Sequence, residues 1–169
     1  MKIEEFIEEF NNARDKEKVV MKHITIDYIP YSRKISMCNN IAEFSTHTQV
    51  LGEKVFKNDS SMRYMLFVYM IVENYTDIEL GQGQDKVDAF DQLERFSVVF
   101  FIAKCLGEEY KRLETVLKMR VDDIFTNERD LPAFLETKIE SLKMISEKMD
   151  ELYEQKNKQD ISAEGVATN

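Results

Sequence analysis

The stretch Met62-Arg-Tyr-Met-Leu-Phe-Val-Tyr-Met-Ile-Val72 is the longest apolar run in the chain, and it decides the fold. Its apolar side chains cover most of the circumference of a helix, which is typical of a helix at the centre of a bundle. A bilayer span needs about 20 apolar residues, so this run is too short to cross a membrane. We therefore predict a central apolar helix that begins at Ser60 or Ser61 and ends near Asn74.

Amphipathic helices are predicted on the N-terminal side of this stretch. Residues 2–12 carry an apolar stripe at helical spacing, with acids on the opposite face. A shorter helix is expected at residues 15–23, followed by an extended linker, because Pro30 disfavours helical geometry in the residue before it. Ser32 is the predicted N-cap of the next helix, which continues to about Phe44.

Residues 46–58 interrupt the helical pattern. Here the sequence Thr46-His-Thr-Gln-Val-Leu-Gly52-Glu-Lys-Val-Phe alternates around a glycine. Alternation around a glycine fits either a loop or a small β-hairpin.

Three further helices are predicted beyond the glycine-rich loop Gly81-Gln-Gly83-Gln. They cover residues 85–96, 98–106 and 108–125, each with apolar residues at helical spacing. Gly107 is the expected C-cap of the second of these helices.

The last helix has the most regular pattern. Its seven apolar positions from Leu131 to Leu152 span 21 residues in six steps, a mean of 3.5, which is the period of a coiled coil. Such a seam either packs within the domain or pairs with another chain. The residues that we single out here as a candidate interaction surface are Leu135, Leu142, Ile145, Met149 and Leu152.

Together these patterns predict an all-α (mainly α) fold, a compact bundle of about six to seven helices. We expect a single domain over residues 1–155, since a chain of this size buries a sizeable core. Residues 156–169 are polar and lack periodicity, so we expect a flexible tail there.

The charge and the cysteines limit the choice of partners and compartment. The chain has 23 Lys and Arg residues against 32 Asp and Glu residues, a net charge of -9. Nucleic acid binding depends on clustered Lys and Arg, so this charge argues against nucleic acid as the main partner.

Cys38 and Cys105 lie far apart in apolar stretches and are expected to be buried, reduced thiols. The first residues lack a secretory signal, so we expect a cytoplasmic protein without a membrane anchor.

No motif indicates catalysis, a cofactor or a metal. His23 and His47 have no partners at metal-ligand spacing, so we expect both on the surface or in linkers. The Gly81 loop lacks the remaining residues of a dinucleotide fingerprint or a P-loop, and Gly-x-Ser-x-Gly is absent.

An acidic stripe is the second candidate interaction surface. Asp85, Asp88 and Asp91 recur three residues apart on one predicted helix, for which Asp85 is the expected N-cap. A calcium loop needs alternating ligands and a glycine, which this spacing lacks. The stripe is therefore interpreted as solvated or as facing a partner.

Four segments carry a resemblance: Tyr28-Ile-Pro30-Tyr31-Ser-Arg-Lys34, Arg63-Tyr-Met-Leu66-Phe67, Tyr75-Thr-Asp77-Ile-Glu79 and Asp122-Asp123-Ile-Phe-Thr-Asn127-Glu128-Arg129. With the long helix that follows, they resemble small proteins encoded by tailed bacteriophages and prophages of Gram-positive bacteria. The resemblance covers roughly residues 2–150 and brings no assigned activity with it. It implies a phage protein that acts through protein contacts in virion assembly.

Our first hypothesis is a non-enzymatic bacteriophage protein that binds other phage proteins or itself, as a structural or assembly component of the head-tail or tail region. Such a protein would lie in the cytosol of the bacterial host or in the virion. The alternative is a phage inhibitor that binds a host or anti-phage defence protein through its acidic surface. A third hypothesis, an enzyme, requires Asp77 and Glu79 to meet Asp122 and Asp123 in one pocket.

Overall fold

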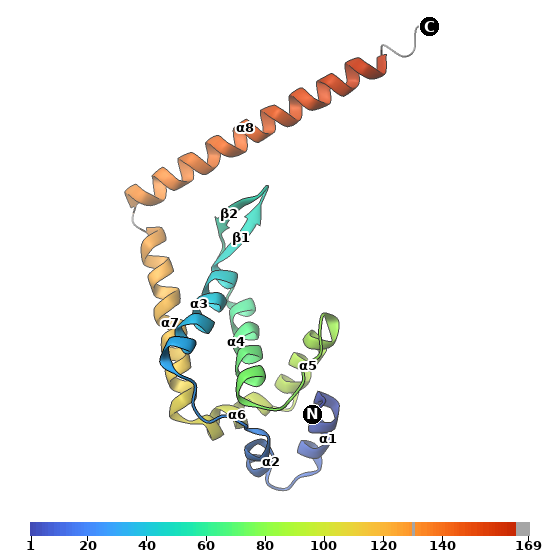
Figure 1. Ribbon diagram of the computed structural model, residues 1–169, viewed down its shortest axis with the longest axis vertical. Helices are drawn as coiled ribbons and strands as arrows, with labels where there is room; N and C mark the ends of the chain where they lie inside the picture. Colours follow the sequence, from blue (N-terminus) through green and yellow to red (C-terminus); the bar gives the residue numbers. More distant parts are fainter. Residues whose placement is uncertain (130, 165–169) are drawn as a thin grey trace. The chain divides into compact units, whose positions relative to one another are not determined.

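A computed structural model describes residues 1–129 and 131–164, with side chains for 1–127, 135–150 and 152 (Figure 1). The described residues form eight α-helices and one two-stranded antiparallel hairpin, which confirms the mainly α-helical fold and shows that residues 46–58 hold a hairpin, one of the two alternatives for this segment. In chain order the elements are α1 (Ile3–Asn12), α2 (Lys16–His23), α3 (Tyr31–Thr46), β1 (His47–Val50), β2 (Glu53–Phe56), α4 (Ser60–Tyr75), α5 (Gln84–Arg95), α6 (Val98–Leu106), α7 (Glu108–Arg129) and α8 (Leu131–Glu164).

The chain divides into two compact units. Unit 1 comprises Met1–Thr48 and Phe56–Ile124, and unit 2 comprises Gln49–Val55 and the described part of Phe125–Asn169. Unit 1 therefore holds the first six helices and most of α7, whereas unit 2 holds the tip of the hairpin and α8. The single domain predicted from the sequence stays a prediction.

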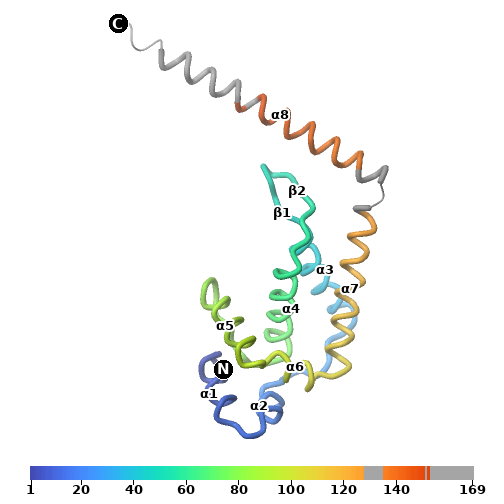
Figure 2. The backbone as a smooth tube through the Cα atoms, turned by 180° about the vertical axis from the view of Figure 1, so that it is seen from behind, coloured from blue at the N-terminus to red at the C-terminus, as the bar shows by residue number. Residues whose placement is uncertain are grey.

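Helix α4 forms the centre of unit 1, as its composition predicts. Its side chains from Phe67 to Val72 are buried, and so is Tyr75. Helices α3 and α5 pack against it, and the Phe67 ring meets the Tyr110 ring of α7 edge to face, with 5.5 Å between the centroids. Figures 1 and 2 both show α3, α4 and α7 side by side. The first turn of α4 is different, since Met62 is exposed.

The N-terminal helices complete the core of unit 1. The apolar stripe of α1 is buried, as predicted, and Phe10 packs edge to face against Phe101 of α6 at 5.5 Å. Helix α1 lies against α2 and α5, and α2 lies against α6. The amphipathic pattern thus placed the correct face of α1 in the core.

Two predicted N-caps are wrong. Helix α3 begins at Tyr31 directly after Pro30, which is the N-cap at φ −55° and ψ 143°, so Ser32 already lies inside the helix. Helix α5 is capped by Gly83 at φ 57° and ψ −124°, so Asp85 lies in the first turn. An L-residue rarely adopts a positive φ, and the glycine therefore decides where the helix starts.

The hairpin that joins α3 to α4 has an unusual tip. Leu51 and Gly52 connect β1 to β2 and have φ values of 53° and 85°. Positive φ at both central residues is what a two-residue type I′ turn requires. Glycine adopts this conformation readily, but Leu51 does so under strain.

Helix α8 continues to Glu164, past the end at residue 155 that its apolar pattern predicts. Residues 165–169 of the predicted tail lie outside the described residues. Among the described helices, none combines the length and the apolarity that a membrane span needs.

Candidate functional site

Helix α8 exposes a row of large apolar side chains, which we call the α8 row: Leu135, Leu142 and Met149. These side chains are 48%, 65% and 45% exposed and follow one another at intervals of seven residues. Since each residue of an α-helix turns by about 100°, residues seven apart lie almost above one another. Of the other predicted interaction residues on α8, Leu152 is exposed and Ile145 is half-buried.

A second row on α8 is half-buried, and one of its residues contacts the hairpin tip within unit 2. Four described side chains of α8 are half-buried and recur three or four residues apart: Lys138, Ser141, Ile145 and Lys148. The Lys148 ammonium donates to the Leu51 carbonyl at 3.0 Å and to the Glu53 carboxylate at 3.1 Å. The structure thus splits the predicted seam into a packed side, with Ile145, and an exposed side, which is the α8 row.

The acidic stripe on α5 is exposed to solvent. Asp85, Asp88 and Asp91 all lie on the outer surface of the helix. The Asp88 carboxylate accepts a hydrogen bond from the Gln84 amide at 2.8 Å. Asp85 also lines a hollow of about 220 Å³ beside the start of α1. The stripe is therefore accessible to a partner, as the sequence predicts, but it encloses no site.

Two hollows of unit 1 expose phenylalanines that the sequence analysis did not single out. Phe44 borders a hollow of about 260 Å³ between α3 and α4, and Phe100 borders one of about 300 Å³ beside Tyr64 and Glu94. The Tyr64 hydroxyl donates to Glu94 at 2.8 Å, and burial together with this carboxylate raises the pKa of Tyr64. The sequence did contain a sign that Phe100 is exposed, namely the run Val98-Val-Phe-Phe-Ile102. Successive residues of a helix cannot all face the core of the protein, so part of this run has to lie on the surface.

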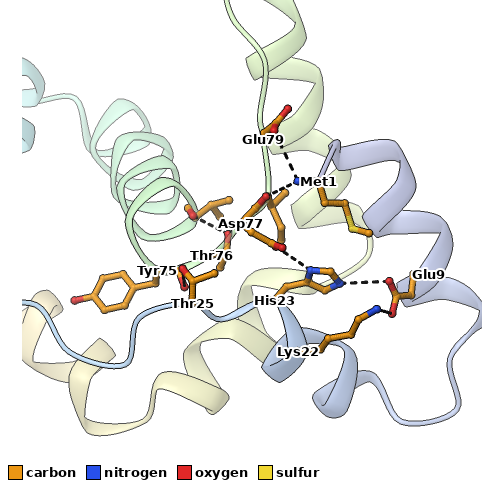
Figure 3. A network of polar contacts seen from close by, with 11 residues as sticks. Met1, Glu9, Lys22, His23, Thr25, Tyr75, Thr76, Asp77 and Glu79 are labelled. Carbon is orange, nitrogen blue, oxygen red and sulfur yellow. Dashed lines mark hydrogen bonds and ion pairs between the residues drawn. The ribbon is translucent and has the colours of Figure 1, made fainter.

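His23 lies in a polar network between α1, α2 and the segment after α4 (Figure 3). It is 3% exposed, with Nδ1 2.8 Å from the Asp77 carboxylate and Nε2 3.3 Å from the Glu9 carboxylate. Lys22 donates to Glu9 at 2.7 Å, and this hydrogen bond is the main cause that lowers the pKa of Glu9.

The predicted position of His23 on the surface or in a linker is wrong. The imidazole packs edge on against Phe6 at 5.3 Å, and carboxylates that are distant in sequence take the place of water around it. His47, the other histidine, is the first residue of β1 and is half-buried.

The Met1 ammonium belongs to the same network (Figure 3). It donates to the Asp77 carbonyl at 2.7 Å and lies 3.8 Å from the Glu79 carboxylate. The Asp77 N–H donates to the His23 carbonyl at 3.1 Å, and the Glu79 N–H donates to the Met1 carbonyl at 2.8 Å. Asp77 and Glu79 therefore fasten the segment after α4 to the N-terminal helices.

A buried ion pair joins α3 to α7. Lys34 is 1% and Glu109 7% exposed, and their charged atoms are 2.5 Å apart. The Glu109 carboxylate also accepts hydrogen bonds from the Tyr75 hydroxyl at 2.7 Å and from the Ile29 N–H at 3.0 Å. Burial raises the pKa of Glu109, but these three donors outweigh it and the net pKa is lowered. The carboxylate is therefore ionised at neutral pH.

The two cysteines are free thiols, in agreement with the expectation of reduced side chains. Cys38 is buried in α3, and burial raises the pKa of its thiol to about 11. Cys105 is half-buried, and burial raises its pKa as well. A thiol with a raised pKa is a poor nucleophile at neutral pH.

The carboxylates that the enzyme hypothesis needs lie apart. Asp77 follows α4, whose last residue Tyr75 contacts Glu109 in the first turn of α7. Asp122 and Asp123 lie near the other end of α7, roughly 20 Å farther along its axis at the rise of an α-helix. Within the part of the chain that the structure describes, no three His, Cys, Asp or Glu side chains are grouped so as to hold a metal ion.

Comparisons with family models, with curated proteins and with solved structures find no significant match to the chain.

Proposed function

We propose that this protein acts by binding other proteins, and that the exposed face of α8 is its main contact surface. The observation that carries the proposal is the α8 row, Leu135, Leu142 and Met149, which is exposed at coiled-coil spacing. Large apolar side chains that line up on a surface mark protein interaction sites more often than they occur without a role. A helix with such a row binds another helix through knobs-into-holes packing.

The resemblance of four segments to phage proteins supports a role for this binding activity in a bacteriophage. On that basis we propose a non-enzymatic component of a tailed bacteriophage that takes part in virion assembly, at the head-tail junction or in the tail. Such a component is made in the cytosol of the bacterial host, and its partners are other phage proteins or a second copy of itself. Nucleic acid is disfavoured as a partner by the net charge of -9.

Two measurements test this proposal. Mass spectrometry of purified virions should detect the chain, and a tagged chain in infected cells should capture another phage protein. The variant Leu135→Glu/Leu142→Glu should lose that capture, because each carboxylate would have to be desolvated in the contact. Met144→Glu is the matched control, since Met144 is also an exposed apolar residue of α8 but lies about 160° around the helix from Leu142. The proposal fails if virions lack the chain and the double variant captures the same proteins as the wild type.

The exposed acidic stripe favours one alternative, an inhibitor that binds a basic surface of a host or defence protein. Asp85, Asp88 and Asp91 are accessible and leave a strong local negative charge on α5. In that case Asp85→Asn/Asp88→Asn/Asp91→Asn would abolish capture of a host protein, and added salt would weaken capture by the wild type. Capture that withstands both changes would exclude this alternative.

A further inference from the structure

We propose that the α8 row, Leu135, Leu142 and Met149, pairs with the same row of a second copy of this chain, so that two α8 helices form the core of a homodimer. This inference rests on the proposed function, because it names the partner of the same surface. Three observations in unit 2 carry it: the geometry of the row, the contacts that leave it uncovered, and the distribution of charge around α8.

The row supplies one of the two apolar positions per heptad that a helix-pairing seam uses. Leu135, Leu142 and Met149 are seven residues apart, so they drift by only about 20° per step around the helix and run for roughly 21 Å along it. Two helices that carry such a row supercoil gently to keep it in contact. Ile139, which is 51% exposed, lies beside the row and widens it.

The packing inside unit 2 leaves this seam uncovered. The hairpin tip contacts α8 through Lys148, which belongs to the half-buried side of the helix together with Ile145. The α8 row begins next to that side and is about half exposed or more at each of its positions. The hairpin therefore fixes one side of α8 and leaves the adjacent apolar side available.

The distribution of charge favours a second copy as the occupant. The four described acids of α8 lie on the face that is neither the row nor the hairpin side: Glu136, Glu140, Glu147 and Asp150. A chain with a net charge of -9 repels its own copies, so a surface for self-association must keep acids out of the contact. The row itself has no charge; Ile139 and Ser146 flank it on the side toward the acids, and Lys138 and Ile145 flank it on the half-buried side.

A two-fold axis places the same patch of each subunit against the other, which requires a self-complementary surface. An uncharged apolar row meets this requirement, whereas a charged partner would find no complementary charge in it. We therefore assign the row to contact between two copies of this chain.

Sedimentation equilibrium of the purified chain over the micromolar range tests the inference. The wild type should have twice the chain mass at high concentration, and Leu142→Glu should raise the dissociation constant about 30-fold or more, as expected for a residue near the centre of a contact. Leu142→Ala, which keeps a good helix former, should weaken the dimer in the same direction. Circular dichroism should show unchanged helix content, because Leu142 is exposed within the chain.

Met144→Glu is the matched control and should leave the dissociation constant unchanged. The inference is overturned if the wild type is a monomer at all concentrations, if Leu142→Glu dimerises like the wild type, or if Met144→Glu weakens the dimer equally. A monomeric wild type whose capture of another phage protein still depends on Leu142 would overturn the homodimer and leave the proposed function standing. A dimer that captures no other protein would support the homodimer and would remove only the proposed contacts with other phage proteins.

Discussion

Lys34 and Glu109 show how single residues stabilise unit 1. Both charges are buried, so Lys34 depends on Glu109 for the interactions that water would otherwise supply, and Glu109 depends on Lys34, the Tyr75 hydroxyl and the Ile29 N–H. Such a pair is costly to form from solvated ions and still more costly to break from one side. We therefore expect the pair to specify how α3 and α7 are aligned more than to add stability.

We predict that Lys34→Met destabilises the protein by about 3 kcal/mol, because it leaves the buried Glu109 carboxylate without its counter-charge. The double variant Lys34→Met/Glu109→Gln should recover most of this loss, since the glutamine oxygen still accepts the hydrogen bonds from Tyr75 and Ile29. Urea unfolding followed by circular dichroism measures both effects. A double variant that is less stable than Lys34→Met would show that the ion pair is not what the lysine contributes.

The same pair predicts a dependence on pH. The pKa of Glu109 is lower in the folded chain than its usual value of 4.5, so the stability it contributes is complete above about pH 4.5 and is lost as the pH falls through the folded value. The free energy of unfolding of the wild type should therefore fall more steeply below pH 4.5 than that of Lys34→Met/Glu109→Gln. Parallel curves for the two proteins would contradict the lowered pKa.

At the scale of elements, the hairpin is held at its two ends by different means. At the base, the Lys57 N–H donates to the Thr46 carbonyl at 2.7 Å, whereas at the tip Leu51 adopts a strained positive φ and its carbonyl accepts a hydrogen bond from Lys148. Strain in an exposed leucine is removable without loss of a buried contact.

We predict that Leu51→Asn stabilises the hairpin by about 0.5–1 kcal/mol, because Asn-Gly is the preferred pair for a type I′ turn. Amide hydrogen exchange in β1 and β2 should slow by the corresponding factor. Gly52→Ala is the control in the opposite direction, since alanine is strained at a φ of 85° and exchange should become faster. Equal exchange in wild type and Leu51→Asn would mean that the turn is not of this type in solution.

At the scale of the whole molecule, the two units differ in how much apolar surface each buries. Unit 1 encloses a core built from seven helices, with α4 at its centre. Helix α8 in unit 2 has the hairpin tip on one side and exposes its apolar row on the next. A helix gains most of its stability from the packing of its apolar face, so the two units should open with different free energies.

Hydrogen exchange across the chain should show this difference. We expect the amides of α4 to exchange only through global unfolding, and those of α8 to exchange at least about tenfold faster. Raising the protein concentration should slow exchange in α8, because pairing of the α8 row stabilises the folded state of that helix. Uniform protection of α4 and α8 at low concentration would contradict the prediction.

The sequence by itself determined the elements and the buried faces of several of them. The stripe of α1, the apolar run of α4 and the turn around Gly52 are local patterns, and a helix or hairpin is a local structure whose period can be read from neighbouring residues. The exposed stripe on α5 was predicted for the same reason. The N-caps at Ser32 and Asp85 were wrong because Pro30 and Gly83, two residues earlier in each case, occupy the N-cap positions.

Only the tertiary structure decided which polar residues meet and which side of α8 stays exposed. His23 and Asp77 are 54 residues apart, and Lys34 and Glu109 are 75 residues apart, so no periodic pattern links them. His23, which was expected at the surface, is buried and contacts the carboxylates of Asp77 and Glu9. Likewise, the apolar seam of α8 was visible in the sequence, but the contact of Lys148 with the hairpin decided which part of it is covered. Local periodicity fixes which face of an element is apolar, and only contacts between distant segments fix what that face touches.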